Sequence, residues 1–347
     1  MKTLQINIIR SLGCLIATFL VTFTALPRAS AQWTVTNLHP SGAAGSRAYT
    51  VHDGKQAGFA IFGGARHACT WTGSAATFRD IHPAWAGATG SEVNATAGGQ
   101  QVGNATFGSP PSHASLWSST SESWVDLTPV GADGSYAFGI DGGQQAGYIV
   151  SGGSTFAAMW SGSAGTYGDL HPGWTGATAS RALDADAGQQ SGYVLTNGLE
   201  HACLWYGTAD SFLELHPPGA DSSVAHGAGG GQQVGLARVG GAIHASLWTG
   251  STASWIDLNP AGGSNSEAYD ADAGEQVGYV TVNGVMRAST WAGSSASWTD
   301  LNRFLPKGYS YSIAFGIWHD SRYTYVVGMA YNTKAKREEA VMWRKRR

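Results

Sequence analysis

Apolar and polar residues alternate over short stretches along most of the chain, and glycine-rich turns separate these stretches. Residues 135–172 illustrate the pattern, with strand-like stretches at 135–141, 144–150, 155–160 and 167–170. The tight turns between them contain Gly142-Gly143, Gly152-Gly153 and Gly162, and glycine accepts the positive φ that such turns need. No stretch shows the 3.6-residue apolar period of a helix. The pattern predicts four short antiparallel strands in each such segment.

Three landmarks show that this four-strand segment repeats along the chain. The first is Gln-x-Gly, with its glycine at Gly58, Gly103, Gly147, Gly192, Gly235 and Gly278, and in a degenerate form at Gly328. The second is a tryptophan that ends a strand, at Trp71, Trp117, Trp160, Trp205, Trp248, Trp291 and Trp343. The third is a corner such as Asp80-Ile81-His82-Pro83. A four-stranded repeat of roughly 45 residues is typical of a propeller blade.

The two ends of the repeat region predict how the ring closes. Residues 32–40, Gln-Trp-Thr-Val-Thr-Asn-Leu-His-Pro, match the fourth strand of a repeat, whereas the chain stops soon after the third-strand residue Trp343. The N-terminal strand is therefore expected to complete the last blade and to remove two exposed edges. We predict an all-β fold, a seven-bladed β-propeller with four antiparallel strands per blade, formed by the single domain 32–347.

The first 31 residues have the pattern of a secretory signal peptide. Lys2 and Arg10 precede an apolar run from Leu12 to Leu26, and Ala29-Ser30-Ala31 has the small-x-small form of a cleavage site. We expect cleavage near Ala31 and a secreted product, extracellular or periplasmic. A lipoprotein signal ending at Cys14 fits less well, because most of the apolar run follows that cysteine. No other segment approaches the ~20 apolar residues of a membrane span.

Cys69 and Cys203 occupy the same position of the repeat, in the first and fourth blades. Blades so far apart in a seven-membered ring cannot bring two Cα atoms within the ~7 Å that a disulfide needs. We therefore predict two separate buried thiols.

Charge is unevenly distributed and argues against a nucleic-acid partner. Residues 331–347 carry seven Lys or Arg and two Glu, although the whole chain has a net charge of −3. The rest of the chain is therefore acidic, which is unfavourable for binding a polyanion. The basic end is expected to be a solvated chain terminus.

The repeats resemble the HAF repeats of bacterial extracellular proteins. The matching strands read His67-Ala68-Cys69, His113-Ala114-Ser115, His201-Ala202-Cys203 and His244-Ala245-Ser246, and Gln101-Val102-Gly103 with its counterparts matches a second element of that repeat. Phenylalanine is absent from the third position of the strand. The resemblance implies secretion and a propeller-like repeat domain, and it implies no established activity.

Most histidines recur once per blade, as framework residues do. His67, His113, His201 and His244 share one position, and His39, His82, His171 and His216 share another. We predict that their ring N–H groups bind buried acceptors and that the aspartates before His82 and His171 are acceptors at the same corner.

Residues that differ from blade to blade are the better candidates for a site. The first strand of a blade normally lines the central channel, and one of its positions reads Arg47, Glu92, Tyr136, Arg181, Val224, Glu267 and Ile313. The position two residues later reads Tyr49, Asn94, Phe138, Leu183, His226, Tyr269 and Phe315. From these sets we predict Arg47, Arg181, Glu92 and Glu267 as binding residues. Packing between blades is the alternative role.

No cofactor or metal site is predicted. Residues 184–188 and 270–274, both Asp-Ala-Asp-Ala-Gly, resemble the start of a calcium loop but lack its third carboxylate and distal glutamate, so we interpret these aspartates as turn caps. Zinc spacings, a nucleophile elbow and a phosphate loop are absent from the sequence.

Three functions remain open. The first is a non-enzymatic binding module for an extracellular glycan or protein, with the loop residues Trp85 and Trp174 as sugar platforms and a monomeric state. The second is a polysaccharide lyase, with Tyr49, His226 or Tyr269 as catalytic base and arginine neutralising the uronate. The third is a purely structural surface protein.

Overall fold

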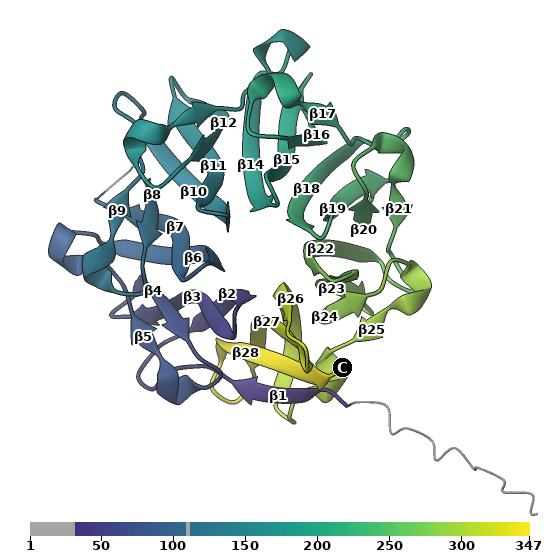
Figure 1. Cartoon of the computed structure of the whole chain (residues 1–347). Coiled ribbons are helices and arrows are strands. Elements are labelled where there is room, and N and C mark those ends of the chain that lie inside the picture. The colour runs from purple at the N-terminus through teal and green to yellow at the C-terminus, as the bar shows by residue number, and fades with distance from the viewer. Residues whose placement is uncertain (1–31, 109–111) are drawn as a thin grey trace, which may run out of the picture. The chain divides into compact units, whose positions relative to one another are not determined.

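The computed structural model describes residues 32–108 and 112–347, so the predicted signal peptide lies outside the described residues. Within the described residues, seven four-stranded antiparallel sheets follow one another around a ring (Figure 1). The predicted seven-bladed β-propeller is confirmed. None of the helices in 32–108 and 112–347 has the length and apolar character needed to cross a bilayer.

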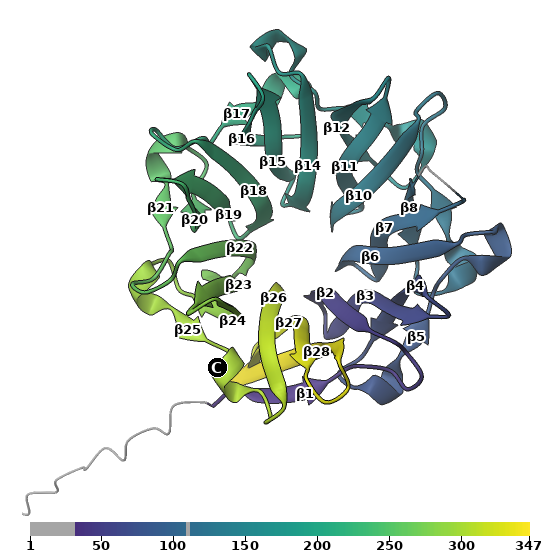
Figure 2. The same ribbon diagram turned by 180° about the vertical axis from the view of Figure 1, so that it is seen from behind.

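The first strand of each blade lies innermost, around the centre of the ring (Figures 1 and 2). These strands are β2 (Ser46–His52), β6 (Gly90–Ala97), β10 (Gly134–Asp141), β14 (Ala179–Asp186), β18 (Ser222–Gly229), β22 (Asn265–Asp272) and β26 (Tyr309–His319). The second strands are β3 (Lys55–Phe62), β7 (Gln100–Thr106), β11 (Gln144–Ser151), β15 (Gln189–Thr196), β19 (Gln232–Val239), β23 (Glu275–Val282) and β27 (Tyr323–Asn332).

The third strands end on the recurring tryptophan or just beyond it. They are β4 (Ala65–Trp71), β8 (Ser112–Trp117), β12 (Ser154–Trp160), β16 (Leu199–Trp205), β20 (Ala242–Trp248), β24 (Val285–Trp291) and β28 (Arg337–Arg346). The fourth strands are β5 (Arg79–Asp80), β9 (Val125–Asp126), β13 (Gly168–Asp169), β17 (Leu213–Glu214), β21 (Ile256–Asp257), β25 (Thr299–Asp300) and, for the last blade, β1 (Thr34–Asn37).

The fourth strands are shorter than predicted, since the stretch expected at 167–170 forms a strand only at Gly168–Asp169. A 3₁₀ turn precedes the fourth strand in each of the first six blades. These turns are η1 (Ala75–Thr77), η3 (Ser121–Ser123), η4 (Ala164–Thr166), η6 (Ala209–Ser211), η7 (Thr252–Ser254) and η8 (Ser295–Ser297). Three more turns connect blades, namely η2 (Ala84–Ala86), η5 (Gly173–Thr175) and η9 (Asn302–Phe304).

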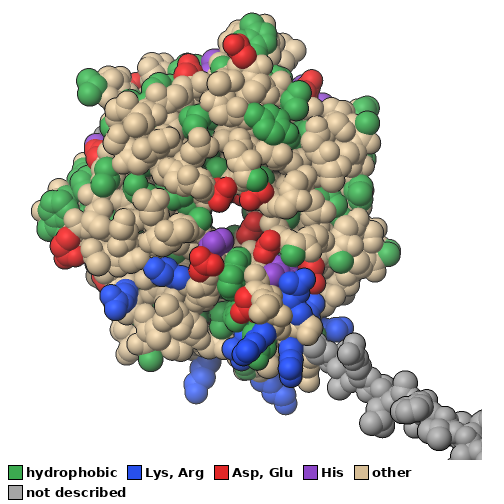
Figure 3. Space-filling view, viewed as in Figure 1, with side chains coloured by type: hydrophobic (Ala, Val, Ile, Leu, Met, Phe, Trp, Pro, Cys, Tyr) green, Lys and Arg blue, Asp and Glu red, His purple; other side chains and the backbone are tan. Residues whose placement is uncertain are grey.

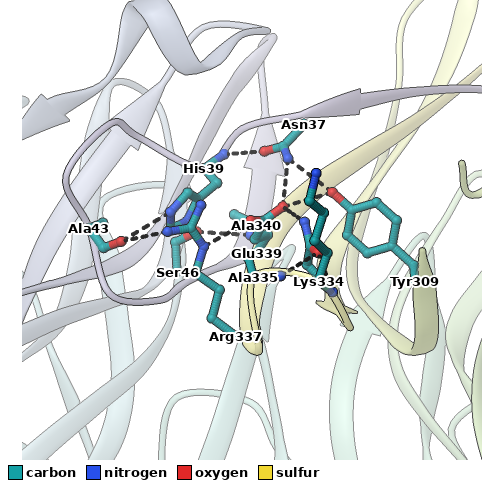
Figure 4. Close-up of polar contacts among 11 residues, drawn as sticks. Asn37, His39, Ala43, Ser46, Tyr309, Lys334, Ala335, Arg337, Glu339 and Ala340 are labelled. Carbon is teal, nitrogen blue, oxygen red and sulfur yellow. Dashed lines mark hydrogen bonds and ion pairs between the residues drawn. The ribbon is translucent and has the colours of Figure 1, made fainter. Parts of the chain in front are cut away.

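The N-terminal strand closes the ring as predicted. β1 pairs antiparallel with β28 in the register Val35↔Trp343 (Figure 2). Next to this pairing, Asn37, Tyr309 and Arg337 all donate hydrogen bonds to the buried carboxylate of Glu339, at 2.7–2.9 Å (Figure 4). Burial opposes ionisation, but the hydrogen bonds lower the pKa of Glu339 to about 2. The seam between the two chain ends is thus ordered by both backbone pairing and charge-assisted hydrogen bonds.

Tryptophans fill the space between neighbouring blades. Trp71 of the first blade is fully buried and packs in one cluster with Val327 and Met342 of the last blade. Trp160 of the third blade packs in the same way with Val102 and Leu116 of the second blade. The repeating tryptophans thus hold neighbouring blades together. Cys69 and Cys203 are buried free thiols, as predicted.

A serine hydroxyl links each blade to the preceding one. Ser180 on β14 accepts the backbone N–H of Ala157 on β12 at 2.8 Å and also bonds the ring of His171. The same link recurs around the ring at Ser46, Ser91, Ser135, Ser180, Ser223, Ser266 and Ser312. Because the serine is fully buried, this hydroxyl satisfies a donor that water cannot reach.

The histidine set of the third strands, His67, His113, His201 and His244, binds the corner carboxylates. His67 bonds Asp80 at 2.7 Å, and equivalent bonds join His113 to Asp126, His201 to Glu214 and His244 to Asp257. Asp80 also accepts the backbone N–H of His82. The interpretation of these histidines and aspartates as framework residues is therefore confirmed. The expectation of buried acceptors is wrong for this histidine set, because its carboxylate partners are 37–52% exposed.

Candidate functional site

A channel runs through the centre of the ring, and two cavities occupy it, of about 560 and 310 Å³. The same seven residues contribute to both cavities, one from each blade: Tyr49, Asn94, Phe138, Leu183, His226, Tyr269 and Phe315. This is one of the two variable sets that the repeat alignment singles out. Figure 3 shows the opening at the centre of one face, with acidic side chains around it.

A β-bulge places each of these seven residues in the channel. The pairing of β2 with β3 shifts between Ala48 and Thr50, so that Tyr49 has no partner, and the other first strands shift at the equivalent point. An extra residue in one strand bends that strand and redirects its side chain. The channel lining is therefore built from residues that the ladder leaves unpaired.

The glycine of Gln-x-Gly makes this bulge possible. Gly58 lies opposite Ala48, and a Cβ on Gly58 would lie 2.1 Å from the carbonyl oxygen of Arg47. A Cβ on the equivalent glycine of each of the other six blades would lie 1.8–1.9 Å from the equivalent carbonyl oxygen. The glycine that recurs in every repeat thus permits the bulge that holds the variable residue of the first strand. The glutamine of the motif has a structural role, since Gln56 accepts the N–H of Gly73 in the turn after the third strand.

Glu267 is the centre of a hydrogen-bonded group in the larger cavity. Tyr269 and Tyr279 each donate a hydrogen bond to its carboxylate, at 2.8 and 2.9 Å. His226 Nε2 lies 3.8 Å from the Glu267 Oε2 atom, too far for a hydrogen bond, and no described residue binds this nitrogen. Burial lowers the pKa of His226, so its imidazole is neutral at pH 7.

The tyrosines of the channel are poorly suited to act as bases. Burial, reinforced by the charge of Glu267, raises the pKa of Tyr269 well above its usual value. Burial likewise raises the pKa of Tyr49. Both phenols therefore stay protonated at neutral pH.

The arginines are already engaged. Arg47 bonds Glu338 at 2.6 Å, and Arg66 bonds Glu92 at 2.7 Å. Arg181 lines the larger cavity and places its guanidinium 4.6 Å from the centre of the Tyr148 ring. Of the predicted binding residues, Arg181, Glu92 and Glu267 thus line the larger cavity, whereas Arg47 is not among its lining residues.

Aspartates surround the smaller cavity, and the interpretation of them as turn caps is wrong. Asp184 accepts the N–H of Ala228, and Asp270 accepts the N–H of Ile317, each in the next blade at 2.9 Å. These carboxylates therefore link blades. Burial raises the pKa of Asp184 well above its usual value and that of Asp270 to about 7. Among the described residues no group of His, Cys, Asp or Glu is arranged to hold a metal ion.

The structure does not bring Trp85 and Trp174 to the channel. They lie in η2 and η5, in equivalent connections between blades, and are 62% and 59% exposed. The Trp85 indole N–H donates to the carbonyl of Ser121, and its ring meets Trp124 edge to face. The exposed face of Trp85 is thus held in a fixed orientation.

Sequence reasoning missed three residues of the larger cavity, namely Tyr193, Glu200 and Leu236. Tyr193 and Leu236 directly follow the glycine of Gln-x-Gly, as does Tyr279, which binds Glu267. That position also differs between blades, so the variation was a usable signal. Register explains the grouping, because each residue after the glycine pairs with a variable first-strand residue, as in Glu267↔Tyr279.

Comparisons with known proteins show the fold alone. No family model and no curated protein matches the chain. Among solved structures, the β-propeller domain of the Trilobed protease from Pyrococcus furiosus is similar with a TM-score of 0.58 and 9% identity, over 87% of this chain and 94% of that one. Pyrococcus horikoshii acylaminoacyl peptidase is similar with a TM-score of 0.56 and 8% identity, over 89% of this chain and 53% of that one.

A puromycin hydrolase mutant in complex with PGG has a TM-score of 0.52 and 14% identity, over 88% of this chain and 56% of that one. The chain thus spans about half the length of the acylaminoacyl peptidase and the hydrolase. At such identities the likeness carries no information about activity.

Proposed function

We propose that this protein is an exported, non-enzymatic binding module of the HAF-repeat type, whose ligand enters the central channel. Support for export comes from the signal-like pattern of residues 1–31, and support for the repeat type comes from the His-Ala strands and the Gln-x-Gly motif. The observation that supports a binding site in the channel is the variation of the side chains at the seven bulged positions.

The residues at the bulged positions differ between blades, whereas the framework residues recur. Serine links, tryptophans and glycines recur in every blade, but the bulged residue is tyrosine, asparagine, phenylalanine, leucine or histidine, according to the blade. Packing of identical blades around an axis calls for identical residues, whereas a ligand without sevenfold symmetry calls for different ones. A cavity of about 560 Å³ with aromatic walls and a few polar groups has the size and character of a small-molecule site.

A channel-filling substitution tests this proposal. Leu183 lines both cavities, and Leu183→Trp would occupy part of the channel. The matched control is Leu213→Trp, on the exposed strand β17. A small-molecule library is screened by thermal shift, and hits are measured by calorimetry. We expect hits that bind the wild type and the control but not Leu183→Trp. Hits that bind all three proteins equally would show that the channel is not the site.

Glycan binding on the rim is the second candidate, because Trp85 and Trp174 expose indole faces at equivalent loops. A flat indole face stacks on the apolar face of a sugar ring. A glycan array with the wild type and with Trp85→Ala plus Trp174→Ala tests this candidate. Loss of a reproducible signal in the double variant, with retention in Leu183→Trp, would place the site on the rim.

The lyase alternative receives less support from the geometry. The larger cavity presents Glu92, Glu200 and Glu267 against the single guanidinium of Arg181. This balance disfavours a uronate, and the protonated state of Tyr49 and Tyr269 disfavours proton abstraction. Ultraviolet assays of polyuronate solutions for the unsaturated elimination product check this alternative. Absence of any ligand in all screens would leave the structural surface protein.

A further inference from the structure

Glu267 is a largely buried carboxylate, with its side chain 16% exposed, and it lacks a permanent cationic partner. The nearest basic group among the described residues is the imidazole of His226, at 3.8 Å. Glu92 and Glu338 differ in this respect, because Arg66 binds Glu92 and Arg47 binds Glu338. Two tyrosine hydroxyls orient Glu267 but leave its charge uncompensated.

Aromatic rings lie next to this carboxylate and continue along the cavity wall. The Tyr269 ring centre lies 5.4 Å from Phe315 and 6.2 Å from Tyr279, and Tyr49 meets Phe315 edge to face at 5.1 Å. Tyr49, Tyr269 and Phe315 all line the larger cavity. Aromatic faces attract an ammonium group and tolerate its methyl or methylene substituents.

Carboxylates outnumber arginines among the residues that line the channel. In the larger cavity Glu92, Glu200 and Glu267 face Arg181. The smaller cavity is lined by Asp141, Asp184, Asp186, Asp270 and Asp272, of which Asp184 and Asp270 carry less charge at neutral pH because burial raises their pKa values. Figure 3 shows acidic side chains around the opening on one face. An acidic cleft raises the local concentration of cations. The basic residues at the chain end are outside both cavities.

We infer that the channel binds an organic ammonium ion, with Glu267 as its counter-ion and the rings of Tyr49, Tyr269 and Phe315 as its walls. The inference rests on the proposed function and names the ligand class of the same site. A bare metal ion fits less well, because the described residues contain no arrangement of metal ligands and aromatic rings form part of the cavity wall. An anionic ligand is disfavoured, because carboxylates outnumber arginines among the residues that line the channel.

Calorimetry on the purified protein tests the inference with two cationic probes, cadaverine and choline. The neutral control is 1,5-pentanediol, which has the same carbon chain as cadaverine, and the anionic control is glutarate. We expect at least one cation to bind, and pentanediol and glutarate to bind at least tenfold more weakly, the ratio that about 1.4 kcal/mol produces. Affinity for the cation should fall as salt is raised.

The key variant is Glu267→Gln, which keeps the size of the side chain and removes its charge. Its carbonyl oxygen can accept from one of the two tyrosines, and its amide N–H can donate to the hydroxyl of the other. It should weaken cation binding at least tenfold, whereas Glu122→Gln, exposed in η3 and outside both cavities, should not change it. Circular dichroism and thermal unfolding verify that Glu267→Gln is folded. If that variant does not fold, loss of cation binding in Leu183→Trp takes its place.

The outcomes separate the inference from the proposed function. Failure of both cations to bind, equal binding of pentanediol, or unchanged cation affinity in Glu267→Gln would overturn the ammonium inference. The proposed function would survive each of these results if a neutral or anionic ligand from the library is blocked by Leu183→Trp. It would fail if no ligand of any charge is sensitive to that substitution.

Discussion

Removal of the closing strand should open the ring. Deleting residues 32–38 removes β1 together with Trp33, which is 6% exposed, and Leu38, which is fully buried. Burial of one large apolar side chain stabilises a fold by about 1.5–3 kcal/mol, so the two contribute about 3–6 kcal/mol. The backbone bond from Leu38 to Ala340 and the pairing with β28 add to this sum. The loss is comparable with the roughly 5–15 kcal/mol that stabilises a whole domain.

The deletion also exposes the edge of β28, which templates pairing between molecules. We therefore expect the truncated protein to aggregate during size-exclusion chromatography with light scattering and to unfold at a markedly lower temperature. Leu38→Ala serves as the milder comparison, because it keeps the strand, costs about 2–5 kcal/mol and should leave the protein monomeric. A truncated protein that stays monomeric with an unchanged melting temperature would refute the closure argument.

Three further predictions concern the framework. Ser180→Ala should lower the free energy of unfolding by about 1–3 kcal/mol in urea titrations, because the buried N–H of Ala157 loses its acceptor; a change within experimental error would contradict the link. Gly147→Ala should cost about 1–3 kcal/mol, since its Cβ would lie 1.9 Å from the Tyr136 carbonyl oxygen; an unaltered melting temperature would show that the bulge adapts freely. Burial raises the pKa of Asp270 to about 7 in the folded protein. The protonated Asp270 carboxyl therefore contributes its full stabilisation below pH ~4, and the free energy of unfolding falls as the pH rises from there through 7. Asp270→Asn cannot ionise and should gain about 2 kcal/mol relative to the wild type between pH 5 and pH 8, and a difference independent of pH would argue against ionisation in place.

Local periodicity was enough to predict the strands, the blade count and the closure. Gly58 and its counterparts mark each repeat, and the absence of a fourth strand after Trp343 pointed to the N-terminal segment. The bulge could not be predicted, because a shift of one residue in pairing depends on two strands at once. Its consequence was nevertheless visible as variation at Tyr49 and the equivalent positions.

The roles of Asp184 and Asp270 could not be predicted from the sequence. Asp-Ala-Asp-Ala-Gly precedes a tight turn, so a local role in that turn was the natural interpretation. The actual partner of Asp184 lies 44 residues away in the next blade, and that of Asp270 lies 47 residues away. Only the curvature of the ring brings these groups together. The environment of Glu267 was unpredictable for the same reason, since Tyr279 and His226 reach it from different strands.

The serine links depend on the order in which the blades are synthesised. Each blade supplies a serine hydroxyl to the preceding blade, so a backbone N–H of that preceding blade has no acceptor until the following blade has been made. The last link returns from Ala340 to Ser46, and β1, which precedes the other strands of the ring in the chain, pairs with β28, which follows them. β1 therefore stays unpaired until all seven blades have been synthesised. Ring closure therefore requires synthesis of the whole repeat region, because a chain that ends before β28 leaves β1 without a partner.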